Sequence, residues 1–227
     1  MELLLPKVRA PVPKLPSYEV LNMAFGVGAG ALLFDKSIYR SHGAITTATW
    51  AAGLHGYCLD FNSANPDYVV IPAAHTQLNF QTESFSIIAR VYVDDFTINH
   101  SLFIRGLINA DGYDWFLHTV GRSEFRTHQA LASQTSRSLP GSILINTWYT
   151  LGISRSGASV RTLIDGVDAT AVVGVHINPL TSARDAKIGV WDNLIAQPYD
   201  GRIEFLRVFR GIALTTSEHL AWHNALA

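Results

Sequence analysis

The feature that most constrains the fold of this chain is an alternation of apolar and polar residues that recurs from residue 19 onward. It is clearest in FSIIARVYV, residues 85–93, where every second side chain from Phe85 to Val93 is apolar. A period of two is typical of strands that bury one face, and turn residues divide the pattern into many short strands. Further strands are predicted at residues 57–61, 67–71, 101–107, 114–119, 123–128, 148–154, 159–164, 168–175, 186–190 and 202–209.

Two local motifs indicate a hairpin and a helix. Asp165-Gly166 lies between two alternating runs, and this dipeptide favours a tight hairpin turn. Thr215 and Glu218 have the spacing of a capping box, and good helix formers continue to residue 225. Many short strands followed by one helix predict an all-β fold: a two-sheet antiparallel jelly-roll β-sandwich with a short C-terminal helix.

The N-terminal segment differs in composition from the rest of the chain. Prolines at this density predict an extended arm, so the chain divides into an arm, residues 1–18, and one domain, residues 19–227. The apolar run after Glu2 is too short for a signal peptide, and we expect the product to fold in a cytoplasm. The prolines and basic residues of the arm are Pro6, Lys7, Arg9, Pro11, Pro13, Lys14 and Pro16.

Composition excludes some classes of function. Hydrophobic residues make up 48% of the 227 residues and charged residues 15%, as expected for a globular domain. The formal net charge of −1 leaves no basic excess for nucleic acid, and no apolar stretch reaches the length of a membrane span. Cys58, the single cysteine, lies in an alternating run and is expected to be a buried apolar residue rather than a catalytic thiol.

Five segments, in order, resemble the laminin G-like jelly rolls of the concanavalin A-like lectin/glucanase superfamily. The resemblance extends over residues 19–225, and it implies the jelly-roll fold more strongly than any function, because these positions mostly build strands and turns. Within it, Trp148 is expected in the core. The five segments are Leu59 to Asn62 with Asp67 to Pro72, Phe85 to Val93, Asn146 to Leu151, Val160 to Val167, and Asp200 to Phe209.

The resemblance also raises the question of a calcium ion. Many family members hold calcium through an aspartate near the C-terminal strand, where this chain has Glu204. Asp60 and Asp67 offer further oxygen ligands, but aspartates in turns are commoner than calcium ligands. We expect no metal and no cofactor, with Asp60, Asp67 and Glu204 as the weak calcium candidates.

The catalytic motifs of enzymes with this fold are incomplete or missing in this chain. The E-x-D-x-x-E strand of glucanases with this fold is missing. Arg122, Glu124 and Arg126 resemble the Arg-x-Glu-x-Arg strand of jelly-roll alginate lyases, with His128 next on the same face, but the lyase's Gln-x-His and Tyr-rich strands are missing too. We interpret this face as solvated salt bridges and expect no catalytic residues. The C-terminal histidines, His219 and His223, are expected in solvent.

Sugar recognition on such folds combines aromatic rings with carboxylates and amides. The loop at residues 109–115 and the segment 191–193 have this composition, and alternation places Arg90 and Tyr92 on the strand face that lines the concave sheet in the family. The alternative for Trp115 and Trp191 is the core. The candidate ligand-binding residues are Arg90, Tyr92, Asp111, Tyr113, Trp115, Trp191, Asp192 and Asn193.

The predicted function is non-catalytic binding or assembly. Laminin G-like domains work outside cells, whereas no export signal is found, and virion proteins of bacterial or archaeal viruses combine these properties. We therefore predict a virion accessory subunit, for capsid decoration or tail association, oligomeric or part of a larger assembly. Its arm would contact neighbouring subunits, and cell-surface glycans are the further partner. The alternative is a free-standing microbial carbohydrate-binding module or lectin, at the cell surface or extracellular; a polysaccharide lyase is a third reading.

Overall fold

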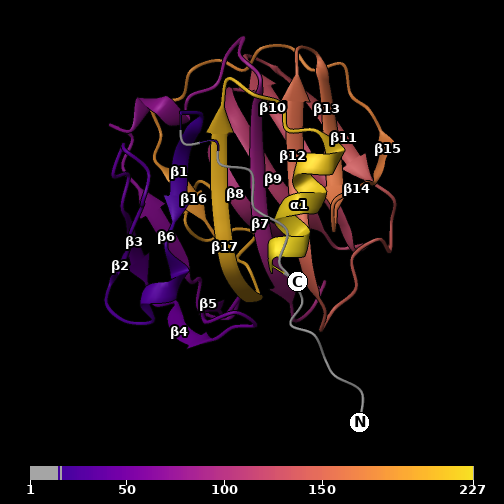
Figure 1. Ribbon diagram of the computed structural model, residues 1–227. Helices are drawn as coiled ribbons and strands as arrows, with labels where there is room; N and C mark the ends of the chain where they lie inside the picture. The colour runs from indigo at the N-terminus through magenta and orange to yellow at the C-terminus, as the bar shows by residue number, and fades with distance from the viewer. Residues whose placement is uncertain (1–14, 16, 227) are drawn as a thin grey trace.

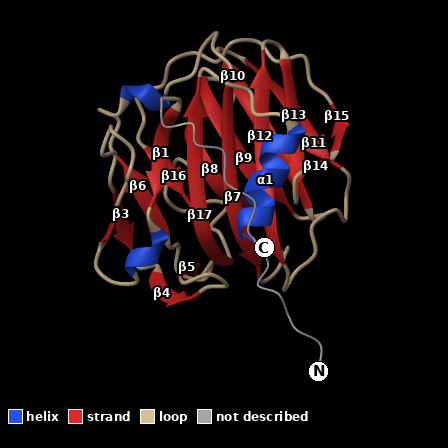
Figure 2. Ribbon diagram, viewed as in Figure 1, coloured by secondary structure: helices blue, strands red, loops and turns tan. Residues whose placement is uncertain are grey.

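The computed structural model describes Leu15 and residues 17–226, which form two stacked antiparallel sheets with one helix on the outside (Figures 1 and 2). The all-β jelly-roll prediction is confirmed. The eight-stranded sheet has the order β14 (Val167–Asp168), β13 (Ser159–Ile164), β12 (Trp148–Ser156), β7 (Phe85–Val93), β17 (Gly201–Arg210), β5 (Tyr57–Phe61) and β4 (Thr49–Ala52), with β1 (Glu19–Met23) also paired to β17.

The second sheet has nine strands. Its order is β15 (Thr170–Val172), β11 (Ala132–Ser138), β10 (Arg122–Gln129), β9 (Asp111–His118), β8 (His100–Leu107), β16 (Ala186–Ile188), β6 (Tyr68–Ile71), β3 (Gly43–Thr46) and β2 (Leu32–Leu33). Short 3₁₀ helices, Phe25–Val27 and Thr76–Leu78, lie in connections, and the helix α1 spans Thr216–Leu226. No helix among the described residues has the length and apolar character needed to span a membrane.

The core lies between the sheets and follows the predicted alternation. In β7, Ile87, Ala89 and Val91 face the other sheet and are buried, while Arg90 and Tyr92 point outward. Cys58 is also buried, and burial raises the pKa of its thiol to about 11, so the thiolate required of a nucleophile is not formed at neutral pH. The prediction of an unreactive buried cysteine agrees with this environment.

The strand β11 is not among the predicted strands, because its residues, ASQTSRS, show no alternation of apolar and polar side chains. Its inward-facing Ser136 is nonetheless fully buried, and its hydroxyl bonds His176 Nε2 at 2.9 Å. His176 Nδ1 bonds the hydroxyl of Thr127 at 2.9 Å on the neighbouring strand. This end of the core is therefore closed by a hydrogen-bonded polar group, which produces no apolar pattern.

The predicted hairpin and helix cap are both present. Asp165 and Gly166 have φ angles of 50° and 79° and connect β13 to β14. At the start of α1, the Thr215 N–H donates to Glu218 Oε2 at 2.7 Å and the Glu218 N–H donates to the Thr215 hydroxyl at 3.3 Å. Figure 1 shows α1 lying in front of β12, on the outer face of the eight-stranded sheet.

The helix attaches through an apolar cluster of its own. Trp222 packs against Phe205 and Phe209 of β17, with ring-centroid distances of 5.4 and 6.1 Å. The expectation of solvent-exposed helix histidines is wrong for His219, which is 2% exposed and lies against Gly152. It is wrong because the helix turns this residue toward the sheet, where the missing side chain of Gly152 leaves room for the ring.

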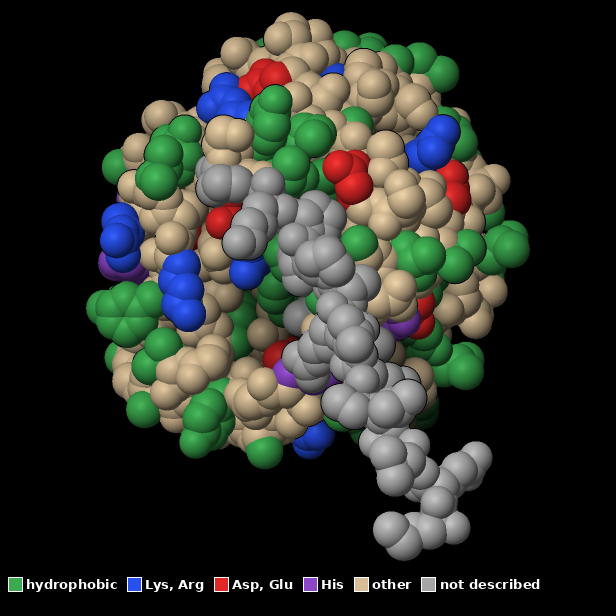
Figure 3. All heavy atoms as spheres, viewed as in Figure 1, with side chains coloured by type: hydrophobic (Ala, Val, Ile, Leu, Met, Phe, Trp, Pro, Cys, Tyr) green, Lys and Arg blue, Asp and Glu red, His purple; other side chains and the backbone are tan. Residues whose placement is uncertain are grey.

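Most of the predicted arm, residues 1–14 and 16, lies outside the described residues. Leu15 packs against the cluster beneath α1, and β1 begins at Glu19, the first residue of the predicted domain. On the face shown in Figure 3, the lysine and arginine side chains stand apart from one another rather than in one stripe.

Candidate functional site

The predicted ligand-binding residues fall in three separate places. Arg90 and Tyr92 lie on the outer face of the eight-stranded sheet, beside α1. Asp111 and the segment 191–193 lie at the nine-stranded sheet, on the other side of the molecule. Tyr113 and Trp115 lie between the two sheets.

Tyr113 and Trp115 are core residues, and their assignment to a ligand site is corrected here. Their exposed fractions are 1% and 0%. The Tyr113 hydroxyl donates to the Leu78 carbonyl at 3.0 Å, and the Trp115 indole N–H donates to the Ser123 hydroxyl at 2.8 Å. In β9 the alternation turns these two rings toward the core and turns Asp114 and Phe116 to the opposite face of the sheet. Composition alone suggested a sugar-binding loop because it does not say which face of a strand each residue occupies.

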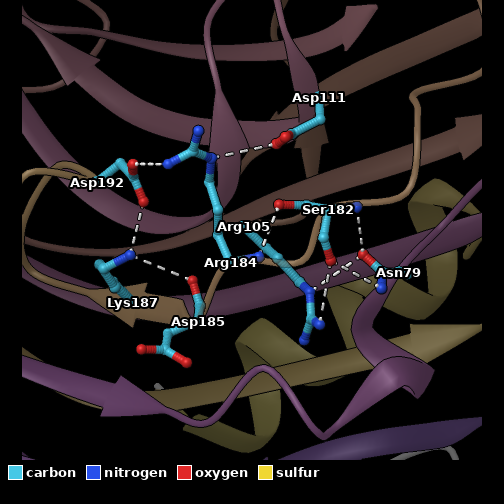
Figure 4. Close-up of polar contacts among 8 residues, drawn as sticks. All are labelled: Asn79, Arg105, Asp111, Ser182, Arg184, Asp185, Lys187 and Asp192. Atoms are coloured by element: carbon cyan, nitrogen blue, oxygen red, sulfur yellow. Dashed lines mark hydrogen bonds and ion pairs between the residues drawn. The ribbon is translucent and has the colours of Figure 1, made fainter.

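Asp111 and Asp192 do come together, through Arg184 (Figure 4). The Arg184 guanidinium bonds Asp192 Oδ2 at 2.6 Å, and its Nε lies 3.6 Å from Asp111 Oδ1. Lys187 on β16 bonds the other oxygen of Asp192 at 2.7 Å. Each charged side chain in this group lies within 4 Å of an opposite charge. These contacts attach the segment after β16 to the sheet, and they leave no charged side chain of the group without a partner for a ligand to pair with.

Trp191 lies on the outer face of the nine-stranded sheet, beside Arg126 of β10. Trp191 is 9% exposed, and the Arg126 guanidinium lies 5.5 Å from its ring centroid and 4.4 Å from that of Phe116. The indole therefore offers little area for stacking on a sugar. Asn193, by contrast, is exposed, and its side-chain oxygen accepts the N–H groups of Ile195 and Ala196.

The residues that resemble the alginate lyase strand share one face, as the alternation predicts, but they are more buried than expected: the side chains of Arg122 and Arg126 are each 15% exposed. Arg126 makes three hydrogen bonds to Asp114, and Arg122 pairs with Glu124, whose side chain is 7% exposed. His128 is fully buried and bonds Asp114 at 3.1 Å. Burial alone would raise the pKa of Asp114, but hydrogen bonds from His128 and Arg126 outweigh it and hold the pKa below its usual range.

A different set of side chains forms an open surface on the eight-stranded sheet. Asp60, Arg202, Tyr92 and Trp148 stand side by side on the adjacent strands β5, β17, β7 and β12. We call these four residues the aromatic row. The Tyr92 and Trp148 rings are 5.4 Å apart and inclined at 52°, and both are half-buried. Arg202 lies 5.2 Å from the Tyr92 ring centroid, and its Nε bonds Asp60 at 3.2 Å.

Polar groups border the aromatic row. The Tyr92 hydroxyl donates to the side-chain oxygen of Asn146, an exposed residue, at 3.3 Å. Toward the helix, Arg90 lies 3.4 Å from Glu204 and bonds the Thr150 hydroxyl at 3.3 Å. His223, near the C-terminal end of α1, bonds the same Thr150 hydroxyl at 3.2 Å. The row therefore lies where the helix ends and the sheet's outer face becomes accessible.

Trp148 and Trp115 occupy the reverse of their predicted positions: Trp115 is buried in the core, and Trp148 lies at the surface. The prediction that Trp148 lies in the core is wrong: Leu151 and Ile153 are the inward residues of β12, so Trp148 and Thr150 point outward. The alternation of residues along β12 predicts the outward orientation of Trp148, whereas the family motif does not show which way the side chain points. Arg202 is not among the sequence candidates, because its place beside the rings follows from the pairing of β17 with β7.

The weak calcium candidates do not converge. Asp60 pairs with Arg202, Asp67 accepts the Asn62 N–H at 2.9 Å, and Glu204 lies against Arg90. Within residues 15 and 17–226, no three His, Cys, Asp or Glu side chains are grouped closely enough to hold a metal ion.

Two surface hollows adjoin the start of α1, and none of the candidate ligand-binding residues lines them. Their volumes are about 390 and 560 Å³, and Arg161 and Thr215 line both. Arg161 lies 3.7 Å from Asp168, and Thr215 is occupied by the helix cap. Neither hollow collects groups suited to acid–base chemistry.

Comparison with solved structures gives the same fold. Domain 4 of AbnA, a GH43 extracellular arabinanase from Geobacillus stearothermophilus, solved with arabinotriose, is 19% identical with a TM-score of 0.64; the match covers 89% of this chain and 97% of that one. The binding domain of Paraclostridial Mosquitocidal Protein 1 is 13% identical with a TM-score of 0.72, covering 94% and 53%.

Botulinum neurotoxin type C, whose cell entry depends on interaction with two ganglioside molecules, is 13% identical with a TM-score of 0.67. That match covers 93% of this chain and 52% of the toxin chain. At such identities the likeness concerns the fold. A search of curated proteins finds no match to the chain. The sequence profile of the Concanavalin A-like lectin/glucanases superfamily matches residues 63–218, so the chain belongs to this superfamily.

Proposed function

We propose that this protein is a non-catalytic binding module that recognises carbohydrate at the aromatic row. The observation that carries the proposal is the pair of half-buried rings, Tyr92 and Trp148, held 5.4 Å apart on a rigid sheet. Flat apolar rings match the C–H faces of pyranoses, and donors and acceptors around them match the hydroxyl groups. Arg202, Asp60 and Asn146 supply such groups at the edge of the rings.

Two of the structural neighbours support carbohydrate as the ligand class. The arabinanase domain was solved with arabinotriose, and type C neurotoxin entry depends on gangliosides, so two proteins that share this fold are associated with sugars. These associations belong to those proteins. For this chain they raise the expectation that an outward aromatic surface on the sandwich meets a glycan.

A non-catalytic role is supported by the ion pairs that the arginines of β10 already make within the protein. The arginines of the lyase reading are engaged with Asp114 and Glu124, and Asp114 is fully buried. A carboxylate substrate would have to displace these partners and leave Asp114 buried and unpaired, which is costly. The lyase reading would return if the protein depolymerised a uronate polymer and Arg126→Ala abolished that activity.

Alanine substitution of each ring tests the proposal. We expect Trp148→Ala and Tyr92→Ala to weaken binding of the best-bound oligosaccharide by about five- to thirtyfold, the equivalent of about 1–2 kcal/mol of lost stacking. Affinity is measured by calorimetry after a glycan array has identified the oligosaccharide. Tyr39→Ala is the matched control, because Tyr39 is 44% exposed on a different segment. Equal affinity in all variants would refute the aromatic row as the site.

As the biological setting, we propose a virion accessory subunit, attached to a capsid or tail and built in a host cytoplasm. The proline-rich composition of residues 1–18 supports it, since an extended arm suits contact with a neighbouring subunit. Deletion of residues 1–14 separates this setting from a free lectin at the cell surface. Loss of assembly with retained glycan binding supports the virion subunit, whereas a monomer with or without the arm supports the free lectin.

A further inference from the structure

One edge of the nine-stranded sheet carries a segment that buries polar side chains and exposes apolar ones. In β2 and the residues after it, exposed and buried side chains alternate over residues 32–38, and the buried ones are Leu33, Asp35 and Ser37. Strands that bury one face ordinarily turn their apolar side chains inward, and a contiguous group of exposed apolar side chains is typical of a contact surface. We call the exposed side chains of this segment the edge strip; they are Leu32, Phe34, Lys36, Ile38, Tyr39 and Arg40.

The edge strip is held in place by the buried carboxylate of Asp35. Its Oδ1 accepts the N–H groups of Asn22 and Ser37, both at 2.8 Å. Its Oδ2 accepts the Ser41 N–H at 2.8 Å and the Ser37 hydroxyl at 2.7 Å. The Asp35 N–H donates to His42 Nδ1 at 3.0 Å and closes the loop. Because four donors satisfy this carboxylate, the loop is preorganised, and its outer side chains are exposed as a fixed feature of the fold.

The apolar side chains protrude rather than line a hollow. Ile38 is 80% exposed, and Tyr39, next to it in the loop, is 44% exposed. Leu32 and Phe34 continue the exposed row along the edge strand. Figure 1 shows β2 and β3 at the outer edge of the molecule, away from α1, and in the same view Figure 3 shows hydrophobic and basic side chains along this edge.

Two cations stand among these apolar side chains. Lys36 lies between Phe34 and Ile38 in the exposed row, and Arg40 follows Tyr39. Both cations are exposed, and within residue 15 and residues 17–226 neither forms an ion pair with a carboxylate. The one carboxylate of the segment, that of Asp35, is turned inward and 1% exposed. The edge strip therefore presents positive charge and apolar surface together.

This combination matches an anionic lipid surface. Apolar and aromatic side chains enter between lipid headgroups, while lysine and arginine beside them are attracted to the lipid phosphates. A membrane accepts a protruding loop without a complementary hollow. A second copy of the chain is a poorer match, because a two-fold contact through the same patch would bring its cations together.

From this arrangement we infer that the edge strip is a peripheral contact with an anionic lipid surface. Ile38 and Tyr39 enter the headgroup region, and Lys36 and Arg40 contact the phosphates. The edge strip lies at the end of the nine-stranded sheet, whereas the aromatic row lies on the outer face of the eight-stranded sheet. The inference therefore goes beyond carbohydrate binding and does not depend on it.

The test is co-sedimentation of the full chain with vesicles of two compositions: phosphatidylcholine alone, and equal parts of phosphatidylcholine and phosphatidylserine. We expect binding to the anionic vesicles only, and loss of binding at about 1 M salt, where the screening length is about 3 Å. Lys36→Gln and Arg40→Gln should each weaken binding about fivefold, since each removes one cation near the anionic surface. Ile38→Ser should weaken it about five- to twentyfold, because less apolar surface enters the headgroup region.

Arg161→Gln and Leu131→Ser are the matched controls. The Arg161 side chain is 59% exposed on β13, in the other sheet, and Leu131 is 94% exposed between β10 and β11, far from β2 in the strand order. Both variants should bind as the unmodified protein does, and losses equal to that of Ile38→Ser would remove the edge strip as the site. Equal binding to both vesicle compositions, or binding to neither, would overturn the inference. Self-association that Ile38→Ser abolishes, without vesicle binding, would instead assign the edge strip to contact between copies of the chain.

Discussion

Two histidines are buried without charge, and their surroundings explain why. His219 lies under α1 against Gly152, where an added Cβ would lie 2.5 Å from the imidazole. Among the described residues its Nε2 has no hydrogen-bond partner. His176 lies between Thr127 and Ser136 inside the sandwich. Burial lowers the pKa of each to about 4 from an ordinary value of 6.5.

Stability should therefore fall as the pH drops from 6.5 toward 4. In this window the unfolded chain binds protons at His176 and His219 that the folded chain does not, so the free energy of unfolding rises with pH. Each histidine accounts for a loss of about 3 kcal/mol across the window. Urea unfolding at several pH values measures the slope, and His219→Gln should remove about half of it. A pH-independent urea midpoint would contradict the prediction.

At the scale of elements, buried arginines rather than ion pairs hold the connections. Arg105 on β8 is fully buried, and its guanidinium donates to the carbonyls of Ala73 and His75 at 2.7 and 2.8 Å (Figure 4 shows it beside Asn79 and Ser182). Arg155 on β12 donates to the Gln81 carbonyl and to Asn178 in the same manner. These bonds attach the connection between β6 and β7 to both sheets.

Replacing Arg105 by methionine should lower the free energy of unfolding by roughly 3–5 kcal/mol. The substitution retains apolar volume but leaves the carbonyls of Ala73 and His75 without their donor inside the protein. Arg161→Met, at a side chain that is 59% exposed, should change stability by no more than about 0.5 kcal/mol. Both are measured by chemical denaturation, and equal effects of the two variants would show that the buried bonds contribute nothing particular.

At the scale of the whole molecule, the sandwich separates two polar surfaces, each of which contains some of the candidate ligand-binding residues. The aromatic row lies on the outer face of one sheet, and the Arg184–Asp192 group lies at the other sheet, with the core between them. Their chemistry also differs: the row exposes rings, whereas the Arg184 group consists of mutually satisfied charges.

Arg184→Ala should consequently leave glycan affinity within about twofold of the unmodified protein, because sites far apart without shared partners behave independently. It should lower stability modestly, since it breaks the bond to Asp192. The affinity is measured with the same oligosaccharide as for Trp148→Ala. A loss of affinity as large as that caused by Trp148→Ala would move the site to the other face.

The sequence alone determined the architecture and much of its detail, because strand periodicity, the Asp165-Gly166 turn and the Thr215–Glu218 cap are local patterns that local geometry obeys. It did not determine β11, whose buried hydroxyls are satisfied by His176 from a distant segment. Nor did it determine the site. Which rings reach the surface depends on which face a strand turns to the core, and which polar groups lie beside the rings depends on neighbours brought together from β5, β7 and β17. Those pairings are long-range, and only the tertiary structure decides them.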